Sequence, residues 1–141
     1  MSLESSSKDI KKSGYSAYQL TPTSRTVLLQ KHPPRFEKII AHHVTYRFPD
    51  TTSPPESTHV HVIGYSSTSE VHVLKDKHIE CMVVQVLGTE KRLDGRLFHI
   101  TLSLDPKTTR PVDSNLLLET HGWIPLDSPF DLKVDPRFIL F

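Results

Sequence analysis

The sequence has one cysteine, no long apolar run and a net charge close to zero. Its single cysteine, Cys81, excludes an intramolecular disulfide framework and a cysteine-based zinc finger. No apolar run approaches the ~20 residues that span a bilayer, and residues 1–8 lack the apolar segment of a signal peptide, so we expect the protein in the cytosol or the nucleus. Lys and Arg number 17 against 16 Asp and Glu, which excludes a strongly basic protein that binds long nucleic acid through many phosphates. This near-neutral charge still allows a site in which a few Lys or Arg side chains surround a single phosphate group.

The length of 141 residues and the hydrophobic content of 36% predict one domain with one core. Residues 1–16 are rich in Ser and Lys and poor in residues that can pack, so we expect a disordered N-terminal tail there. Residues 17–141 are expected to form the single domain.

Hydrophobic patterning predicts several strands and two short helices. Alternating or continuous apolar residues predict strands over residues 38–48, 58–65, 70–74, 80–87 and 96–105. Capping residues and flanking prolines predict helices over residues 25–31 and 115–119. The C-terminal residues contain aromatic side chains and three prolines, which is typical of short edge strands and turns. This mixture predicts the α+β class.

Nine histidines stand out in a chain of this length, and two of them occur in the same local pattern. His43 is followed two positions later by Thr45, and His99 is followed two positions later by Thr101. On a strand, residues two apart share one face and lie roughly 7 Å apart. The intervening residues are apolar and point to the other face. Each strand therefore has one apolar face and one face with an imidazole and a hydroxyl.

Two imidazoles and two hydroxyls that converge suit phosphodiester chemistry. The ordinary pKa of imidazole is about 6.5, so one ring of a pair can be neutral while the other is protonated near neutral pH. The neutral ring can accept a proton from water or a ribose hydroxyl, and the protonated ring can donate one to the leaving oxygen. The hydroxyls can donate hydrogen bonds to phosphate oxygens as negative charge develops. This chemistry requires no metal ion and no other cofactor.

The pair His43-Val44-Thr45 and His99-Ile100-Thr101 resembles the two His-x-Thr/Ser motifs of the 2H phosphoesterase superfamily. This superfamily includes LigT-like RNA 2′,3′-cyclic phosphodiesterases and the cyclic phosphodiesterase domains of tRNA ligases. The resemblance implies a two-lobed α+β fold with antiparallel sheets around a central groove and short outer helices. It also implies metal-independent hydrolysis of a nucleotide or RNA-terminal 2′,3′-cyclic phosphate, or of a related 2′–5′ linkage, as in RNA repair.

The resemblance also implies roles for individual residues. His43 and His99 would be the acid and base pair, with the first histidine as acid and the second as base, and Thr45 and Thr101 would bind the phosphate. The two histidines are only 56 positions apart (99 − 43), which is short for LigT-like members and implies that one lobe is reduced.

Two further residues continue the polar faces of these strands. Arg47 follows Thr45 and Ser103 follows Thr101 at the same two-residue spacing, so both are expected to contact phosphate or ribose. His42 competes with His43 for the site, but its predicted face is apolar and we interpret it as a core residue. A one-residue change of register would exchange the two histidines.

Two other functions remain open at this point. The same groove could bind an RNA end or a cyclic nucleotide without cleaving it. Alternatively, His59 and His61 share a strand face and could begin a metal site of a β-barrel enzyme. The next acidic residue is Glu70, and no third ligand follows at a matching distance, so we favour a protein without a metal.

Overall fold

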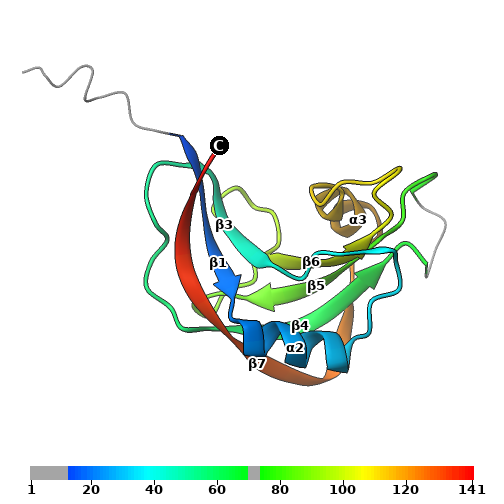
Figure 1. The fold of residues 1–141 in the computed structure, drawn as a ribbon, viewed down its shortest axis with the longest axis horizontal. Helices are drawn as coiled ribbons and strands as arrows, with labels where there is room; N and C mark the ends of the chain where they lie inside the picture. The colour runs from blue at the N-terminus through cyan, green and yellow to red at the C-terminus, as the bar shows by residue number, and fades with distance from the viewer. Residues whose placement is uncertain (1–12, 70–73) are drawn as a thin grey trace, which may run out of the picture.

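The computed structural model describes residues 13–69 and 74–141 (Figure 1). This part of the chain contains seven strands and two helices and is mostly β. In chain order the elements are β1 (Gly14–Leu20), α2 (Pro22–Lys31), β2 (Lys38–Ile39), β3 (His43–Asp50), β4 (His59–Ser67), β5 (Ile79–Gln85), β6 (His99–Leu104), α3 (Asp113–His121) and β7 (Ile124–Leu140).

Six of the strands form a closed antiparallel barrel. The strands neighbour one another in the order β6-β3-β1-β7-β4-β5, and a further pairing of β5 with β6 closes the circle. The short strand β2 adds to β6 beside β3. The β-rich structure with two helices agrees with the α+β class. The two-lobed arrangement that the resemblance implies is not confirmed, because the described strands close into one barrel.

The barrel interior is the main hydrophobic core. Its side chains come from every strand of the barrel, because alternate residues of each strand point inward. Helix α2 packs against one end of the barrel, where Leu28 joins this core, and Thr21 caps the helix by accepting a hydrogen bond from the backbone N–H of Ser24. The largest inward side chains include Tyr18, Met82, Ile100 and Leu132.

A second, smaller core lies on the outer face of β5, under α3. Ile79, Cys81 and Val83 point away from the barrel interior and pack against Leu117 and Leu118 of the helix. Strand β5 is therefore buried on both faces, which explains its continuous apolar sequence. This packing holds α3 beside the outer face of β6.

Two predicted segments differ from the structure. Strand β1 begins at Gly14, so the expected tail is shorter, and residues 1–12 lie outside the described residues. The predicted strand 38–48 is interrupted at Ala41, whose φ of 42° breaks the extended backbone. Residues 70–73 of another predicted strand also lie outside the described part.

The C-terminal segment differs most from the sequence prediction. It forms one 17-residue strand, β7, instead of short edge strands. Residues Ile124 to Lys133 pair with β4, and residues Val134 to Leu140 pair with β1, so this strand joins two parts of the barrel. In residues 13–69 and 74–141, neither helix has the length and apolar character needed to cross a membrane.

Candidate active site

The two His-x-Thr motifs lie on neighbouring strands of the barrel. Val44 of β3 pairs with Ile100 of β6 in antiparallel register, and both side chains are fully buried in the barrel interior. The histidine and threonine on either side of each apolar residue therefore point to the outer face. The structure brings together the four residues that the sequence predicted, although they are far apart in the chain.

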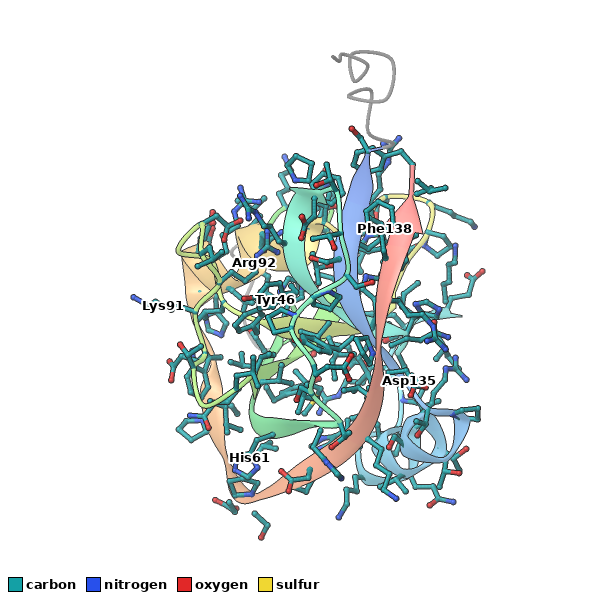
Figure 2. The ribbon with its side chains drawn as sticks, turned by 90° about the vertical axis from the view of Figure 1, so that its left-hand side faces the viewer. Tyr46, His61, Lys91, Arg92, Asp135 and Phe138 are labelled. Carbon is teal, nitrogen blue, oxygen red and sulfur yellow. The ribbon has the colours of Figure 1, made fainter. Side chains whose placement is uncertain are left out.

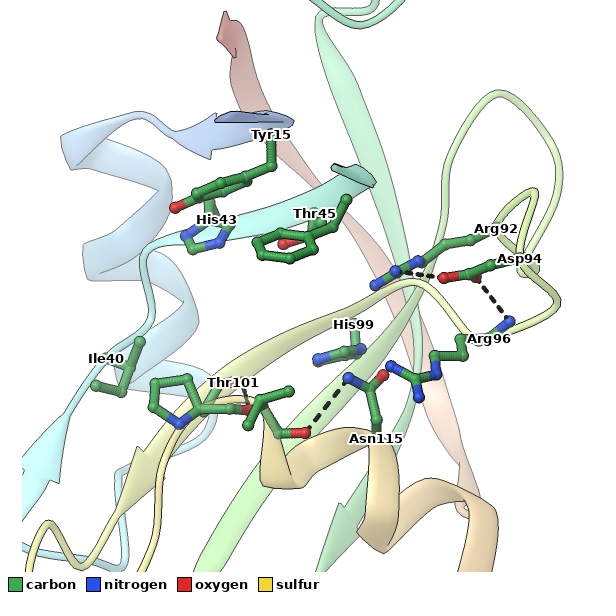
Figure 3. Close-up of a pocket in the computed structure, with 13 residues that line it drawn as sticks. Tyr15, Ile40, His43, Thr45, Arg92, Asp94, Arg96, His99, Thr101 and Asn115 are labelled. Carbon is green, nitrogen blue, oxygen red and sulfur yellow. Dashed lines mark hydrogen bonds and ion pairs between the residues drawn. The ribbon is translucent and has the colours of Figure 1, made fainter. Parts of the chain in front are cut away.

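These four side chains line one pocket of about 390 Å³ on the outside of the barrel (Figure 3). Strands β3 and β6 form its floor, the first turn of α3 and the preceding loop form one wall, and the loop before β6 forms another. Figure 3 shows the two imidazole rings facing the same space from the two strands. The other lining residues are Tyr15, Ile40, Phe48, Arg92, Asp94, Arg96, Pro111, Val112 and Asn115.

The ring of His99 is held in one orientation. Its Nδ1 donates a hydrogen bond to the backbone carbonyl of Leu97, 3.0 Å away, because a carbonyl can only accept. The proton of the neutral ring is therefore on Nδ1, and the lone pair is on Nε2. Burial lowers the pKa of His99 below the ordinary 6.5, the hydrogen bond to Leu97 opposes this, and the charges of Arg92 and Arg96 lower it further. The lowered pKa favours the neutral form of the His99 ring.

The surroundings of His43 are different. Its Nδ1 shares a hydrogen bond of 2.9 Å with Nδ1 of His42, and its ring packs against that of Tyr15 at 5.6 Å between centroids. Burial lowers the pKa of His43 to about 4, and the neighbouring His42 and His99 contribute to this decrease. Because an anion stabilises an imidazolium, a phosphate in the pocket would raise the pKa of His43 again.

The two threonines also differ in their surroundings. Thr101 is buried, and its hydroxyl contacts the Oγ of Ser114 at 2.9 Å and the carbonyl of Pro111 at 3.3 Å. Thr45 is half-buried and lines the same pocket. Thr101 thus ties β6 to the start of α3, while Thr45 lines the pocket.

Arg47 and Ser103, which were predicted to contact phosphate or ribose, do not line this pocket. Arg47 lines a second pocket, which shares Phe48, Arg92 and Asp94 with the first. Opposite β1, Ser16 pairs with Arg47 but Ala17 pairs with Thr45, so β3 has one extra residue there. This bulge reverses the alternation of side chains, which turns Arg47 away and brings Phe48 to the pocket. Ser103 does lie on the same strand face as Thr101.

Ser103 is nevertheless covered by another segment. Its Oγ donates a short hydrogen bond to the carboxylate of Glu80 and accepts one from the backbone N–H of Phe36. The side chain is fully buried and belongs to a structural network in which Glu80 also accepts from Tyr65 and from the backbone of Arg35. The pairing of β2 with β6 lays residues 35–39 over this part of the face.

The interpretation of His42 as a core residue is also wrong, because its side chain is exposed. It follows the break at Ala41 and precedes the first residue of β3, so it is not part of the alternating strand pattern. The predicted preference for His43 as the pocket residue agrees with the structure.

Sequence reasoning missed the cationic wall of the pocket. Arg92 and Arg96 come from the segment between β5 and β6; no functional role was predicted for either, and Arg96 was expected to begin a strand. Two tight turns shape this loop: Val86 exchanges backbone hydrogen bonds with Thr89, and the backbone N–H of Gly95 donates to the carbonyl of Arg92. Gly88 and Gly95 have φ of 82° and 85°, so two glycines within a charged segment were the available signal of a folded loop.

The histidines of the alternative metal site lie elsewhere. His61 pairs with Asp131 at 2.7 Å, and Figure 2 shows His61 far from Arg92 in the barrel. Within the described ranges, no group of three or more His, Cys, Asp or Glu side chains could hold a metal ion. Cys81 is fully buried, and burial raises the pKa of its thiol to about 12, so it is a packing residue.

The chain was compared with protein-family models, with curated proteins and with solved structures, and no match was found. The site is therefore interpreted from its own geometry and chemistry.

Proposed function

We propose that the chain is a metal-independent phosphodiesterase that hydrolyses a nucleotide or RNA-terminal 2′,3′-cyclic phosphate, or a related 2′–5′ linkage. The observation that supports this proposal is the convergence of His43 and His99 in one pocket, from neighbouring strands, with a hydroxyl beside each ring. The proposal agrees with the resemblance to the 2H phosphoesterases, and it does not depend on their two-lobed fold.

His99 is the general base. Its Nε2 lone pair accepts a proton from a water molecule, whose oxygen forms a bond with phosphorus. His43, protonated in the complex, donates its proton to the ribose oxygen as the bond from phosphorus to this oxygen breaks. The product is a phosphate monoester with a free neighbouring hydroxyl, and proton exchange with solvent restores both rings.

The anionic substrate itself prepares the acid. In the free protein the pKa of His43 is about 4, so the ring is mostly neutral at neutral pH. A phosphate bound between the two motifs favours the imidazolium by Coulomb attraction and raises this pKa. Thr45 can donate a hydrogen bond to a phosphate oxygen, since it lines the pocket and carries a hydroxyl group.

The test is hydrolysis of adenosine 2′,3′-cyclic phosphate with and without EDTA, with products separated by chromatography. The expected result is formation of one monophosphate at a rate that EDTA does not change. Activity that EDTA abolishes and zinc restores would instead support a metal enzyme.

A second candidate function is a module that binds an RNA end or a cyclic nucleotide without cleaving it. The low pKa of His43 favours this candidate, because an acid that is unprotonated in the free protein is a poor proton donor. Binding of adenosine 2′,3′-cyclic phosphate without turnover between pH 4 and 8 would establish it.

A further inference from the structure

Among the side chains of residues 13–69 and 74–141, two buried polar atoms have no hydrogen-bond partner. They are Nε of Arg92 and Oδ1 of Asn115, and both residues line the pocket of the two histidines. Buried polar groups are almost always paired in folded proteins. The Arg92 atom is a donor that an anion can satisfy, whereas the amide oxygen of Asn115 is an acceptor and would need an N–H or O–H group, so only Arg92 points to an anionic ligand.

Arg92 is the more informative of the two residues. Its side chain is only 6% exposed, although it carries a permanent positive charge. Its Nη2 donates to Asp94 at 2.6 Å, which leaves other N–H groups of the guanidinium available. Backbone hydrogen bonds from Arg92 to Arg96 and from Gly95 to Arg92 close the turn that holds this residue in place.

Arg92 lies closer to His99 than to His43. Its charge, with that of Arg96, lowers the pKa of His99 but is not among the causes of the shift at His43. The aromatic ring of Tyr15 packs instead against His43. The pocket is therefore cationic near His99 and aromatic near His43. Figure 3 shows the guanidinium of Arg92 directed into the space above His99.

The hydroxyl of Thr101, which was expected to bind the phosphate, is already engaged in hydrogen bonds within the protein. This hydroxyl has a single proton, and it already contacts the carbonyl of Pro111 and the hydroxyl of Ser114 inside the structure. A donor to the phosphate on this side of the pocket must come from another residue. Two guanidinium groups line the pocket there, those of Arg92 and Arg96. The side chain of Arg96 is half-exposed and pairs with Glu119, whereas that of Arg92 is buried and keeps an N–H group without a partner.

We propose that Arg92, oriented by Asp94, is the phosphate-binding residue of this pocket. It donates the hydrogen bonds to phosphate that were expected from Thr101. The ligand class is a phosphate ester whose unesterified oxygens face the guanidinium near His99. The ester oxygens then point toward His43, which matches the acid and base assignment above. This orientation rests on the proposed function, whereas the binding of a phosphate group by Arg92 does not.

The test measures binding of inorganic phosphate by calorimetry to the full chain and to Arg92→Gln. The expected result is a loss of affinity of about tenfold or more in the variant, because a charge-assisted contact is removed. Arg92→Lys, which keeps the charge without the planar fork, should lose less. Arg137→Gln is the matched control, since Arg137 is half-exposed and pairs with Asp135 on β7 away from the pocket.

Asp94→Asn separates ligand binding from a structural role. If Arg92 acts only by holding the loop through its ion pair, Asp94→Asn should weaken phosphate binding as much as Arg92→Gln does. If Arg92 binds phosphate, Asp94→Asn should retain most of the binding, because an amide oxygen can still accept the orienting hydrogen bond from Nη2 while a competing negative charge is removed. Amide NMR spectra of each variant establish that the fold is intact.

The outcomes distinguish this inference from the proposed function. Loss of phosphate binding in Arg92→Gln without cyclic-phosphate turnover by the native chain would overturn the function and keep the anion site. Turnover by the native chain, with unchanged phosphate binding and unchanged kcat/KM in Arg92→Gln, would overturn the anion site and keep the function. Absence of phosphate binding to the native chain at millimolar concentration would overturn the inference as well.

Discussion

The two His-x-Thr motifs have the same residue types on the same face of neighbouring strands, but their surroundings hold them differently. In the motif on β6, His99 donates to Leu97 and Thr101 contacts Ser114, so both side chains are fixed by hydrogen bonds. In the motif on β3, His43 contacts another imidazole and Thr45 faces the pocket. The same three-residue pattern thus occurs once with both side chains bonded to neighbouring elements and once with its histidine bonded only to the adjacent histidine.

Under the proposed function, this difference suits the two histidines to different roles. A base must present an unprotonated nitrogen in one orientation, and the hydrogen bond to Leu97 provides this for His99. An acid must gain a proton when the substrate arrives. The pKa of His43 is lowered by burial and by its neighbours His42 and His99, and a bound anion would oppose this shift.

The largest expected effect comes from removing either ring. His43→Ala and His99→Ala should each lower kcat/KM for a cyclic phosphate by roughly 10²- to 10⁴-fold, with the fold retained. A nucleotide nitrophenyl ester sharpens the comparison, because nitrophenolate leaves without a proton. Activity on this ester should be largely restored in His43→Ala and not in His99→Ala. His61→Ala, at the exposed pair with Asp131, is the control.

Restoration in His99→Ala instead would show that the acid and base are exchanged. Full activity of His43→Ala on cyclic phosphates would remove the site assignment altogether.

The second largest effect is the pH dependence. For kcat/KM, the base His99 must be neutral and its pKa lies below 6.5, while the acid His43 must be protonated and its pKa is about 4. We therefore expect the kcat/KM maximum on the acidic side of pH 6.5 and a decrease of about tenfold per unit above it. Because bound phosphate raises the pKa of His43, the kcat maximum should lie at higher pH. Coincident maxima would contradict preparation of the acid by the substrate.

Substitution of the two threonines should affect different quantities: catalytic rate for Thr45 and stability for Thr101. Thr45→Val should lower kcat by about tenfold and leave the melting temperature unchanged, because Thr45 lines the pocket. Thr101→Val should lower the free energy of unfolding by about 1–3 kcal/mol, because Ser114 loses a buried partner. Thermal unfolding and initial rates of both variants check this, and a stability loss in Thr45→Val alone would reverse the comparison.

The smallest effects on activity belong to the two residues that the bulge and the covering segment remove from the pocket. Ser103→Ala should lower the free energy of unfolding by about 1–3 kcal/mol, because the buried carboxylate of Glu80 loses a donor, and should leave kcat unchanged. Arg47→Gln should change neither quantity appreciably, since Arg47 is exposed. A strong loss of activity in Arg47→Gln would place this residue at the substrate.

Local patterns predicted the elements that depend on nearby residues. The capped helix before Pro33, the alternating strand that contains His99 and the helix after Asp113 all appear in the structure. The predictions failed for elements whose structure depends on pairing with segments that are distant in the sequence. Strand β7 is extended over 17 residues because β4 and β1 supply partners along its length, and its three prolines hid this pairing.

The order of residues alone determined that His43 and Thr45 share a face, as do His99 and Thr101, because side chains alternate along any extended strand. Only the tertiary structure decided that β3 and β6 are neighbours, since that pairing joins segments more than fifty positions apart. It also decided that Arg92 lines the pocket and that Arg47 and Ser103 do not. Bulges, covering segments and loop turns act through packing between distant parts of the chain, which no local pattern encodes.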